Sequence, residues 1–248
     1  MREFEAEVLA LNFFSGSRYM GAYLGPQEEL ATWVKPQVEA WSHGVKVLGK
    51  TSRQHPQSAY DGLGMSLQLK WQYLQKTVPG VGTLMGSIEE DLRKTIFSAL
   101  FRGEEINAGF RKILGHSVKY GGLGIPDPRF SVESAYNTSK ADSGELVDSL
   151  LGGSALNYLG QRACVSQAIV GDRKDKKHVE LVELARLKEL SDGQERNCFH
   201  KATINEAWLR SIPHCFNGPE LSWEEFWDNI CLRYGLMPQD IPETCEWL

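Results

Sequence analysis

Residues 26–48 read PQEELATWVKPQVEAWSHGVKVL, and the spacing of the apolar side chains in this stretch indicates the fold class. Apolar residues recur at steps of three and four, which places them on one face of a long α-helix. Pro26 suits a helix start, and Pro36 removes one backbone donor, so we expect a helix with a kink. The apolar stripe consists of Leu30, Trp33, Val34, Val38, Trp41, Val45 and Leu48.

Two further stripes with the helical period follow this segment. One begins at Pro56 and stops at Pro79-Gly80, and the other begins at Ser87, whose spacing to Glu90 is that of a capping box. Three successive helices joined by short turns predict a helical bundle over residues 26–102. The two stripes consist of Tyr60, Leu63, Leu67, Trp71 and Leu74, and of Ile88, Leu92, Ile96 and Leu100.

Two short β-strands are predicted before the bundle. Residues 3–13 alternate in part between apolar and polar side chains, and residues 18–24 are rich in aromatic ones. Ser15-Gly16-Ser17 between them has the composition of a turn. We therefore expect a β-hairpin within residues 1–25, too small to be stable alone.

The pattern is less regular after residue 102. The segment KYGGLGIPDP, residues 119–128, contains three glycines and two prolines and predicts a loop or an extended crossing segment. Segments between residues 131 and 190 tolerate helix, and in the last of them Val179, Val182 and Leu187 fall on one face.

A capping box at Ser222 and Glu225 opens a final helix. The sequence thus predicts a mainly α protein in three parts. These are a short hairpin in residues 1–25, a helical bundle in residues 26–102 and an acidic helical region in residues 103–248.

Charge is distributed unevenly along the 248 residues, whose net charge is -5. Residues 1–102 are net +1 and residues 103–248 are net -6, and the window from Lys35 to Lys76 holds six basic residues against two acidic ones. Aromatic residues lie among these basic groups, which suits phosphate neutralisation and base stacking. The alternative is that Trp41 and Trp71 belong to the core and that the lysines form a solvated face.

No catalytic, metal-binding or cofactor-binding motif is present. The run Glu89-Glu90-Asp91 lies at a predicted helix start, where interaction with the helix dipole explains it without an ion. Five cysteines without a C-x-x-C pair favour thiols in a reducing compartment, and Cys245 is expected to bind no zinc. We find no signal peptide or membrane span, and expect an intracellular protein of the cytoplasm or nucleus.

Four segments together resemble the region just downstream of the catalytic core in non-LTR (LINE-like) retrotransposon reverse transcriptases. The family pattern has an aromatic-Leu-Gly strand pair, a Pro-Gln-x-Ala-Tyr helix running into Trp-x-Tyr-Leu-Gln-Arg, and a later Gly-Gly-Leu-Gly-Ile-Pro, and Lys76 stands here where the family often has Arg. The matching segments here are SRYMGAYLG (17–25), KTSRQHPQSAYDGLGMSLQLKWQYLQKTVPGVG (50–82), YGGLGIPDP (120–128) and LSWEEFWDNICLRYGLMPQDIPETC (221–245).

The resemblance implies a primer-grip hairpin at Tyr19, Met20 and Gly21, followed by a helical thumb over residues 27–102. The family's metal-binding aspartate pair is missing, because no Asp-Asp pair occurs in this sequence. The resemblance therefore implies a fragment whose fingers, palm and Cys/His-rich tail lie outside it. Such a fragment would be no enzyme and would use no cofactor.

Two functions remain open at this point. The first is a nucleic-acid-binding remnant of a reverse transcriptase, with RNA, an RNA–DNA hybrid or a separate catalytic segment as its partner. The second is a helical protein-interaction or scaffold module without a nucleic-acid role. The candidate nucleic-acid-binding residues are Tyr19, Met20, Gly21, Lys46, Lys50, Arg53, Lys70 and Lys76.

Overall fold

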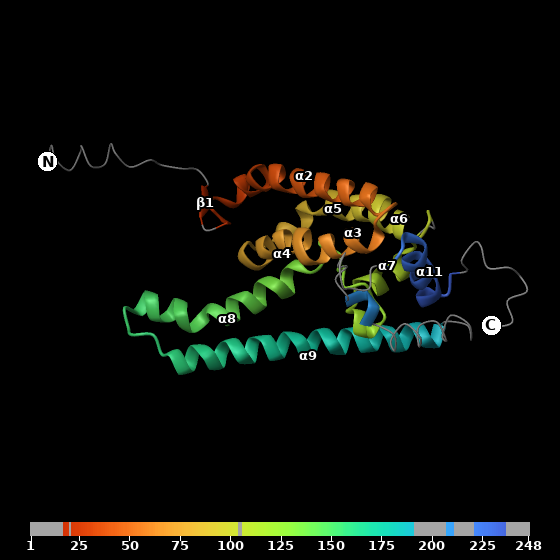
Figure 1. Cartoon of the computed structure of the whole chain (residues 1–248). Coiled ribbons are helices and arrows are strands. Elements are labelled where there is room, and N and C mark those ends of the chain that lie inside the picture. The colour runs from red at the N-terminus through yellow and green to blue at the C-terminus, as the bar shows by residue number, and fades with distance from the viewer. Residues whose placement is uncertain (1–16, 20, 104–105, 191–206, 211–220, 237–248) are drawn as a thin grey trace, which may run out of the picture.

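A computed structural model confirms the mainly α fold class (Figure 1). The structure describes residues 17–19, 21–103, 106–190, 207–210 and 221–236. Among them, the longer helices are α2 (Gln27–Thr51), α3 (Pro56–Gly62), α4 (Gln68–Thr77), α5 (Gly86–Asp91), α7 (Ala108–Gly115), α8 (Val132–Gly152), α9 (Tyr158–Leu190) and α11 (Trp223–Tyr234).

A hairpin is present within residues 1–25, but it is smaller than predicted and its strands have other bounds. Strands β1 (Ser17–Tyr19) and β2 (Ala22–Leu24) pair antiparallel, with Tyr19 opposite Ala22. The predicted second strand, residues 18–24, was therefore wrong, because it contains the turn of the hairpin. Gly21 supplies that turn with a φ of 86°, a value that other residues rarely adopt. The predicted strand at residues 3–13 lies outside the described residues.

The bundle contains the three predicted helices, two of them with a π-helical turn. The π segments η1 (Leu63–Leu67) and η3 (Leu92–Phe97) join α3 to α4 and α5 to α6 (Ser98–Leu100). Helix α2 continues through Pro36. Between the second and third helices lies a short 3-10 turn, η2 (Val81–Leu84).

The capping box predicted at Ser87 and Glu90 was wrong. Helix α5 begins at Gly86 after Met85 and has no side-chain cap. Ser87 lies inside the first turn, and Glu90 pairs instead with Lys94 one turn later.

Side chains from all three helices form one apolar cluster, as the stripes predicted. Trp71 is buried in it, so its indole is unavailable for base stacking, and Trp41 is partly buried and packs against it. The cluster also includes Leu123 and Phe226 from beyond residue 102. The two larger predicted parts of the chain thus share a core. The boundaries of the three parts, at residues 25 and 102, remain predictions from the sequence.

Each carboxylate of the run Glu89-Glu90-Asp91 has a cationic partner. Glu89 and Arg111 are both buried and form two hydrogen bonds of 2.7 Å. Asp91 pairs with Lys46 at 3.3 Å. Among the described residues, no group of three His, Cys, Asp or Glu side chains could hold a metal ion.

The loop at residues 119–128 lies against the second bundle helix. It is irregular apart from one 3-10 turn, η4 (Val118–Tyr120), as predicted. The Tyr60 hydroxyl donates to the Leu123 carbonyl at 2.7 Å, and the Gln75 amide donates to the Pro128 carbonyl at 2.7 Å. These buried bonds cross more than 50 residues of sequence and position the loop.

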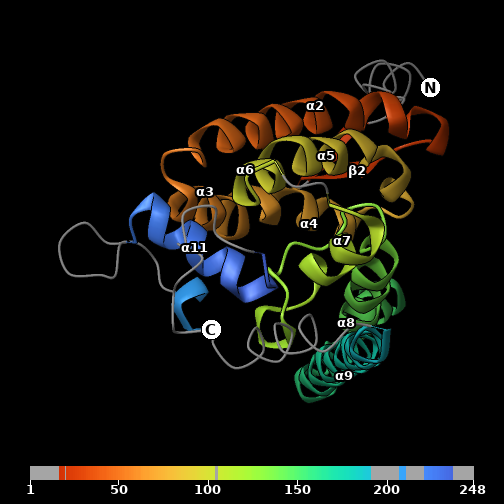
Figure 2. The same ribbon diagram turned by 90° about the vertical axis from the view of Figure 1, so that its right-hand side faces the viewer.

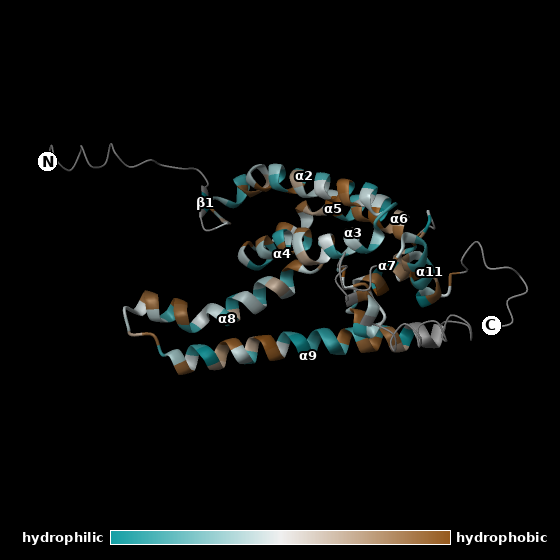
Figure 3. Cartoon of the chain, in the orientation of Figure 1, coloured by the Kyte–Doolittle hydropathy of each residue, from teal (hydrophilic) through white to brown (hydrophobic). Residues whose placement is uncertain are grey.

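Helices α8 and α9 form a long antiparallel hairpin beside the bundle, seen almost end-on in Figure 2. Residues predicted as separate helical segments join into these two helices. Apolar residues lie at the tip of the hairpin and at further places along α9, where Figure 3 is brown.

The face of α9 that carries Val179 and Val182 is exposed. Val179 and Val182 are more than half exposed, whereas Glu180 and Leu184 are buried. Glu180 accepts hydrogen bonds from the Ser117 backbone N–H and hydroxyl, at 2.8 and 2.9 Å. The side chain of Leu187 lies outside the described residues.

The last described helix, α11, begins with the predicted capping box. The Ser222 hydroxyl accepts from the Glu225 N–H, and the Glu225 carboxylate accepts from the Ser222 N–H. Cys245 lies outside the described residues, so its expected lack of zinc stays a prediction. No helix in the described part of the chain is long and apolar enough to cross a membrane.

Candidate functional site

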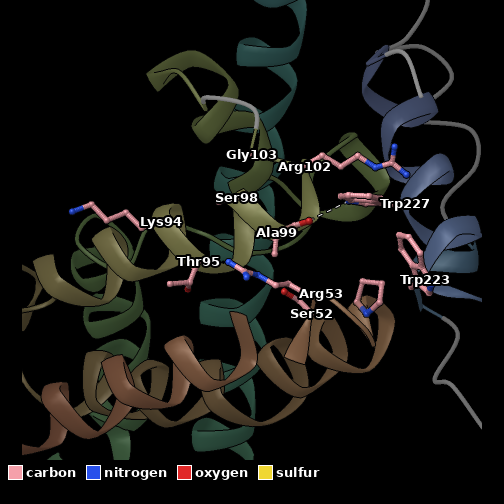
Figure 4. Close-up of a pocket in the computed structure, with 11 residues that line it drawn as sticks. Ser52, Arg53, Lys94, Thr95, Ser98, Ala99, Arg102, Gly103, Trp223 and Trp227 are labelled. Atoms are coloured by element: carbon pink, nitrogen blue, oxygen red, sulfur yellow. Dashed lines mark hydrogen bonds between the residues drawn. The ribbon is translucent and has the colours of Figure 1, made fainter. Parts of the chain in front are cut away.

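A pocket of about 400 Å³ lies where three distant segments meet (Figure 4). The end of α2 and the start of α3 form one wall, the η3–α6 helix forms a second, and α11 forms the third. Its described lining contains three cationic side chains, Arg53, Lys94 and Arg102, and no carboxylate. Trp223 and Trp227 supply the aromatic side of the pocket.

Trp227 is held rigidly against the bundle. Its indole N–H donates to the carbonyls of Ala99 (3.1 Å) and Leu100 (2.9 Å), which lie in the last turn of the η3–α6 helix. Carbonyls at a helix end lack helical partners, so this contact satisfies polar groups and joins α11 to the bundle. The Arg102 guanidinium lies 3.4 Å from the centre of the Trp227 ring and covers it.

Arg102 has an unusual backbone. Its φ is 52°, and no other non-glycine residue in the described part of the chain has a positive φ. Its Nε atom is buried and has no hydrogen-bond partner among the described residues. Strained backbone and unsatisfied polar atoms concentrate at functional sites, which makes Arg102 a candidate ligand-binding residue.

Arg53 and Lys94 contribute charge to the opposite side of the pocket. Lys94 pairs with Glu90, and that hydrogen bond raises the pKa of Lys94. Figure 4 shows Lys94 extending away from the two tryptophans. Arg53 is exposed and follows Lys46 and Lys50 at helical spacing, so the three form a basic ridge that leads to the pocket.

Trp223 lies between this pocket and a second hollow. The second hollow has a volume of about 460 Å³ and shares Pro56 and Trp223 with the first. Trp223 is 44% exposed and its ring lies 5.8 Å from that of Trp227. An exposed indole beside guanidinium groups can stack on a planar ring while the cations hold an anion.

The predicted binding residues fall into three groups. Lys46, Lys50 and Arg53 form the ridge just described, although Lys46 also pairs with Asp91. Lys70 and Lys76 are exposed on α4 and do not line the pocket.

The third group is the hairpin. A side chain added at Gly21 would lie 2.8 Å from a ring carbon of Tyr73, so the turn packs on that ring. Tyr19 lies in β1, but the structure does not describe its side chain, and Met20 lies outside the described residues.

Four residues of the pocket escaped the sequence prediction. Trp223 and Trp227 are four apart in a helix whose capping box was recognised, so a shared helix face was available as a signal. Lys94 and Arg102 lie outside the basic window, and no pattern in the sequence relates them to α11.

The fold and the pocket define a mainly α protein with a basic and aromatic surface hollow. No protein-family model, curated protein or solved structure matches the chain.

Proposed function

We propose that the chain binds RNA or an RNA–DNA hybrid, as a non-catalytic relative of the thumb region of non-LTR reverse transcriptases. The observation that carries the proposal is the first pocket, whose described lining has three cations and no carboxylate, with the exposed Trp223 indole at its edge. Lys46 and Lys50 extend this positive charge along α2. A strand would follow the ridge through phosphate contacts and place one unstacked base on Trp223.

Binding is tested by fluorescence anisotropy of the full chain with a labelled RNA and a labelled RNA–DNA hybrid, at about 50 to 200 mM salt. The affinity is expected to fall as salt rises. Arg53→Glu should weaken binding and reduce the salt slope by about 0.7 to 0.9 per lost phosphate contact. Trp223→Ala should cost about 1 to 3 kcal/mol of binding free energy and leave the slope unchanged.

Lys76→Glu is the matched control, because it makes the same charge change on α4, outside the pocket. We expect it to bind almost as well as the unchanged chain. Equal losses for Lys76→Glu and Arg53→Glu would show that the whole basic window binds and that the pocket has no special role. No binding to either nucleic acid would refute the proposal.

The same proposal includes the lack of polymerase activity, since the sequence has no Asp-Asp pair to hold catalytic metal ions. Metal-dependent primer extension by the purified chain, abolished by a single substitution within it, would contradict this part.

A second candidate function is a protein-interaction module. The observation that favours it is the exposure of large apolar residues on the α8–α9 hairpin, which has no connection with the pocket.

A further inference from the structure

The tip of the α8–α9 hairpin carries apolar residues (Figure 3), and several of them are largely exposed. Leu150 and Leu151 at the end of α8, and Tyr158 and Leu159 at the start of α9, are between 73 and 84% exposed. Leu146, Val147, Ile169 and Val170 extend this surface along both helices. Contiguous exposed apolar residues of this kind mark interaction sites.

The two helices of the hairpin do not use these side chains to hold each other. Polar bonds link the two helices: the Gln161 amide donates to the Asp142 carbonyl at 2.8 Å, and Ser134 donates to Asp172 at 2.8 Å. Smaller residues such as Gly160 and Cys164 are partly buried, whereas the large apolar residues are more exposed. The large apolar residues therefore face outward and are available to something outside the hairpin.

Charge along the hairpin is polarised from tip to base. Residues 141–166, which include the tip, have three carboxylates against one arginine and are net -2. Residues 167–178, nearer the body, have four basic residues against two carboxylates and are net +2. The charges in question are Asp142, Glu145, Asp148 and Arg162 in the outer part, and Asp172, Arg173, Lys174, Asp175, Lys176 and Lys177 in the inner part.

We infer that two copies of this chain pair through their α8–α9 hairpins in an antiparallel four-helix arrangement, with the tip of each beside the base of the other. This arrangement covers the apolar outer faces of both hairpins. It also places each acidic outer part against the basic inner part of its partner. A two-fold axis repeats the favourable contact, as in most homodimers.

The charge pattern selects both the partner and the orientation. Pairing with the tips side by side would place like charges together, net -2 against net -2 and +2 against +2. The antiparallel pairing is the self-complementary one, so a second copy supplies both required charges. Tyr158 to Lys177 spans about 30 Å of helix, so the overlap is long enough to include tip and base.

The test separates a second copy from every other occupant of the apolar surface. The outer-part variant carries Glu145→Lys and Asp148→Lys, and the inner-part variant carries Arg173→Glu and Lys177→Glu. Each variant alone places like charges at both contacts of the dimer. Mixed together, they restore opposite charges at both contacts.

Sedimentation velocity over a wide concentration range is the measurement. We expect the unchanged chain to dimerise, each charge variant alone to dimerise at least about tenfold more weakly, and the equimolar mixture to recover dimers. Leu150→Glu with Leu159→Glu should give a monomer, because both positions are exposed in one copy. Met65→Glu, at another exposed apolar position on η1, is the control and should dimerise normally.

Three results would overturn the inference. They are a monomeric unchanged chain at all concentrations, a mixture that dimerises no better than its components, and dimers that survive the Leu150→Glu/Leu159→Glu change. The first would point to a segment of the same chain or a different protein as the cover. These outcomes are independent of RNA binding, because no hairpin residue lines the pocket.

Discussion

Arg102 is a single residue in which the backbone and the side chain have opposite effects on stability. Its left-handed conformation costs an L-residue about 1 to 2 kcal/mol. Its guanidinium recovers part of that through the contact with Trp227, since such contacts contribute about 0.5 to 2 kcal/mol. The two contributions can be separated because glycine and alanine each remove the side chain but differ in backbone strain.

We expect Arg102→Gly to change the free energy of unfolding by less than about 1 kcal/mol, because strain is relieved while stacking is lost. Arg102→Ala should be less stable than the glycine variant by about 1 kcal/mol, because it loses stacking and keeps the strain. Urea unfolding measures both differences. Under the proposed function, both variants also lose RNA affinity to a similar extent. A glycine variant less stable than the alanine variant would contradict the strain argument.

Asp61 gives a residue-level prediction about pH. Burial raises the pKa of Asp61 to about 6, and its Oδ2 atom accepts no hydrogen bond from the described residues. Because the pKa of the folded state lies above that of the unfolded state, the carboxyl favours folding at low pH. That contribution is lost as the pH rises through about 6.

Asp61→Asn should therefore be more stable than the unchanged chain at about pH 7.5 and similar to it at about pH 4. Thermal unfolding at the two pH values checks this. Glu90→Gln serves as the control, since Glu90 is exposed and its pair with Lys94 contributes little. The same stabilisation at both pH values would assign the effect to packing.

Helix α9 shows, at the level of an element, where a periodic pattern misleads. The pattern places Val179 and Val182 on one face, and although apolar faces usually pack on a core, both residues are more than half exposed. The neighbouring surface is instead η4 and the residues before it, which offer the Ser117 N–H and a His116 nitrogen 2.6 Å from Glu183. Acidic side chains match that surface, and the apolar periodicity carries no information about it.

The register of α9 predicts contrasting effects at two apolar positions. Leu184→Ala should lower the free energy of unfolding by about 2 to 3 kcal/mol, because the side chain is buried against the body. Val182→Ala, at a position that is 53% exposed, should change it by less than about 0.5 kcal/mol. Similar losses at both positions, measured by urea unfolding, would mean that the face with Val182 is packed as well as the face with Leu184.

Elements with strong apolar stripes were predicted well, and their ends were predicted less well. The stripes through Val34, Leu63 and Ile96 all reach the core, because helical spacing alone decides which face is apolar. The box at Ser222 forms, whereas the one expected at Ser87 does not. A cap depends on where the chain turns, and α5 begins at Gly86, so Ser87 is already inside the helix.

For the whole molecule, the pocket could not be predicted because its walls come from three distant segments, one of which, α11, lies more than 100 residues from the other two. Arg53 belonged to a basic window visible in the sequence. Tertiary contacts alone bring Arg102 and Trp223 close to Arg53. Among these contacts are the Trp227 bonds to Ala99 and Leu100 and the bond from the Leu221 N–H to Gln57. Composition could indicate a basic surface with aromatic residues, but not where that surface is hollowed.

The shared core makes a prediction about how the described part of the chain unfolds. Leu123 and Phe226 lie in one apolar cluster with the bundle residues, and the Tyr60 hydroxyl bonds across to the Leu123 carbonyl. We therefore expect a single urea transition, with tryptophan fluorescence and far-UV circular dichroism coincident.

Tyr60→Phe leaves the buried Leu123 carbonyl without its donor. It should lower the free energy of unfolding by about 1 to 3 kcal/mol and lower the urea midpoint seen by both probes. Tyr158→Phe, at the exposed tip of the hairpin, is the matched control and should leave the midpoint unchanged. Two separate transitions, or a Tyr60→Phe shift in only one probe, would mean that the bundle and the region after residue 102 fold independently.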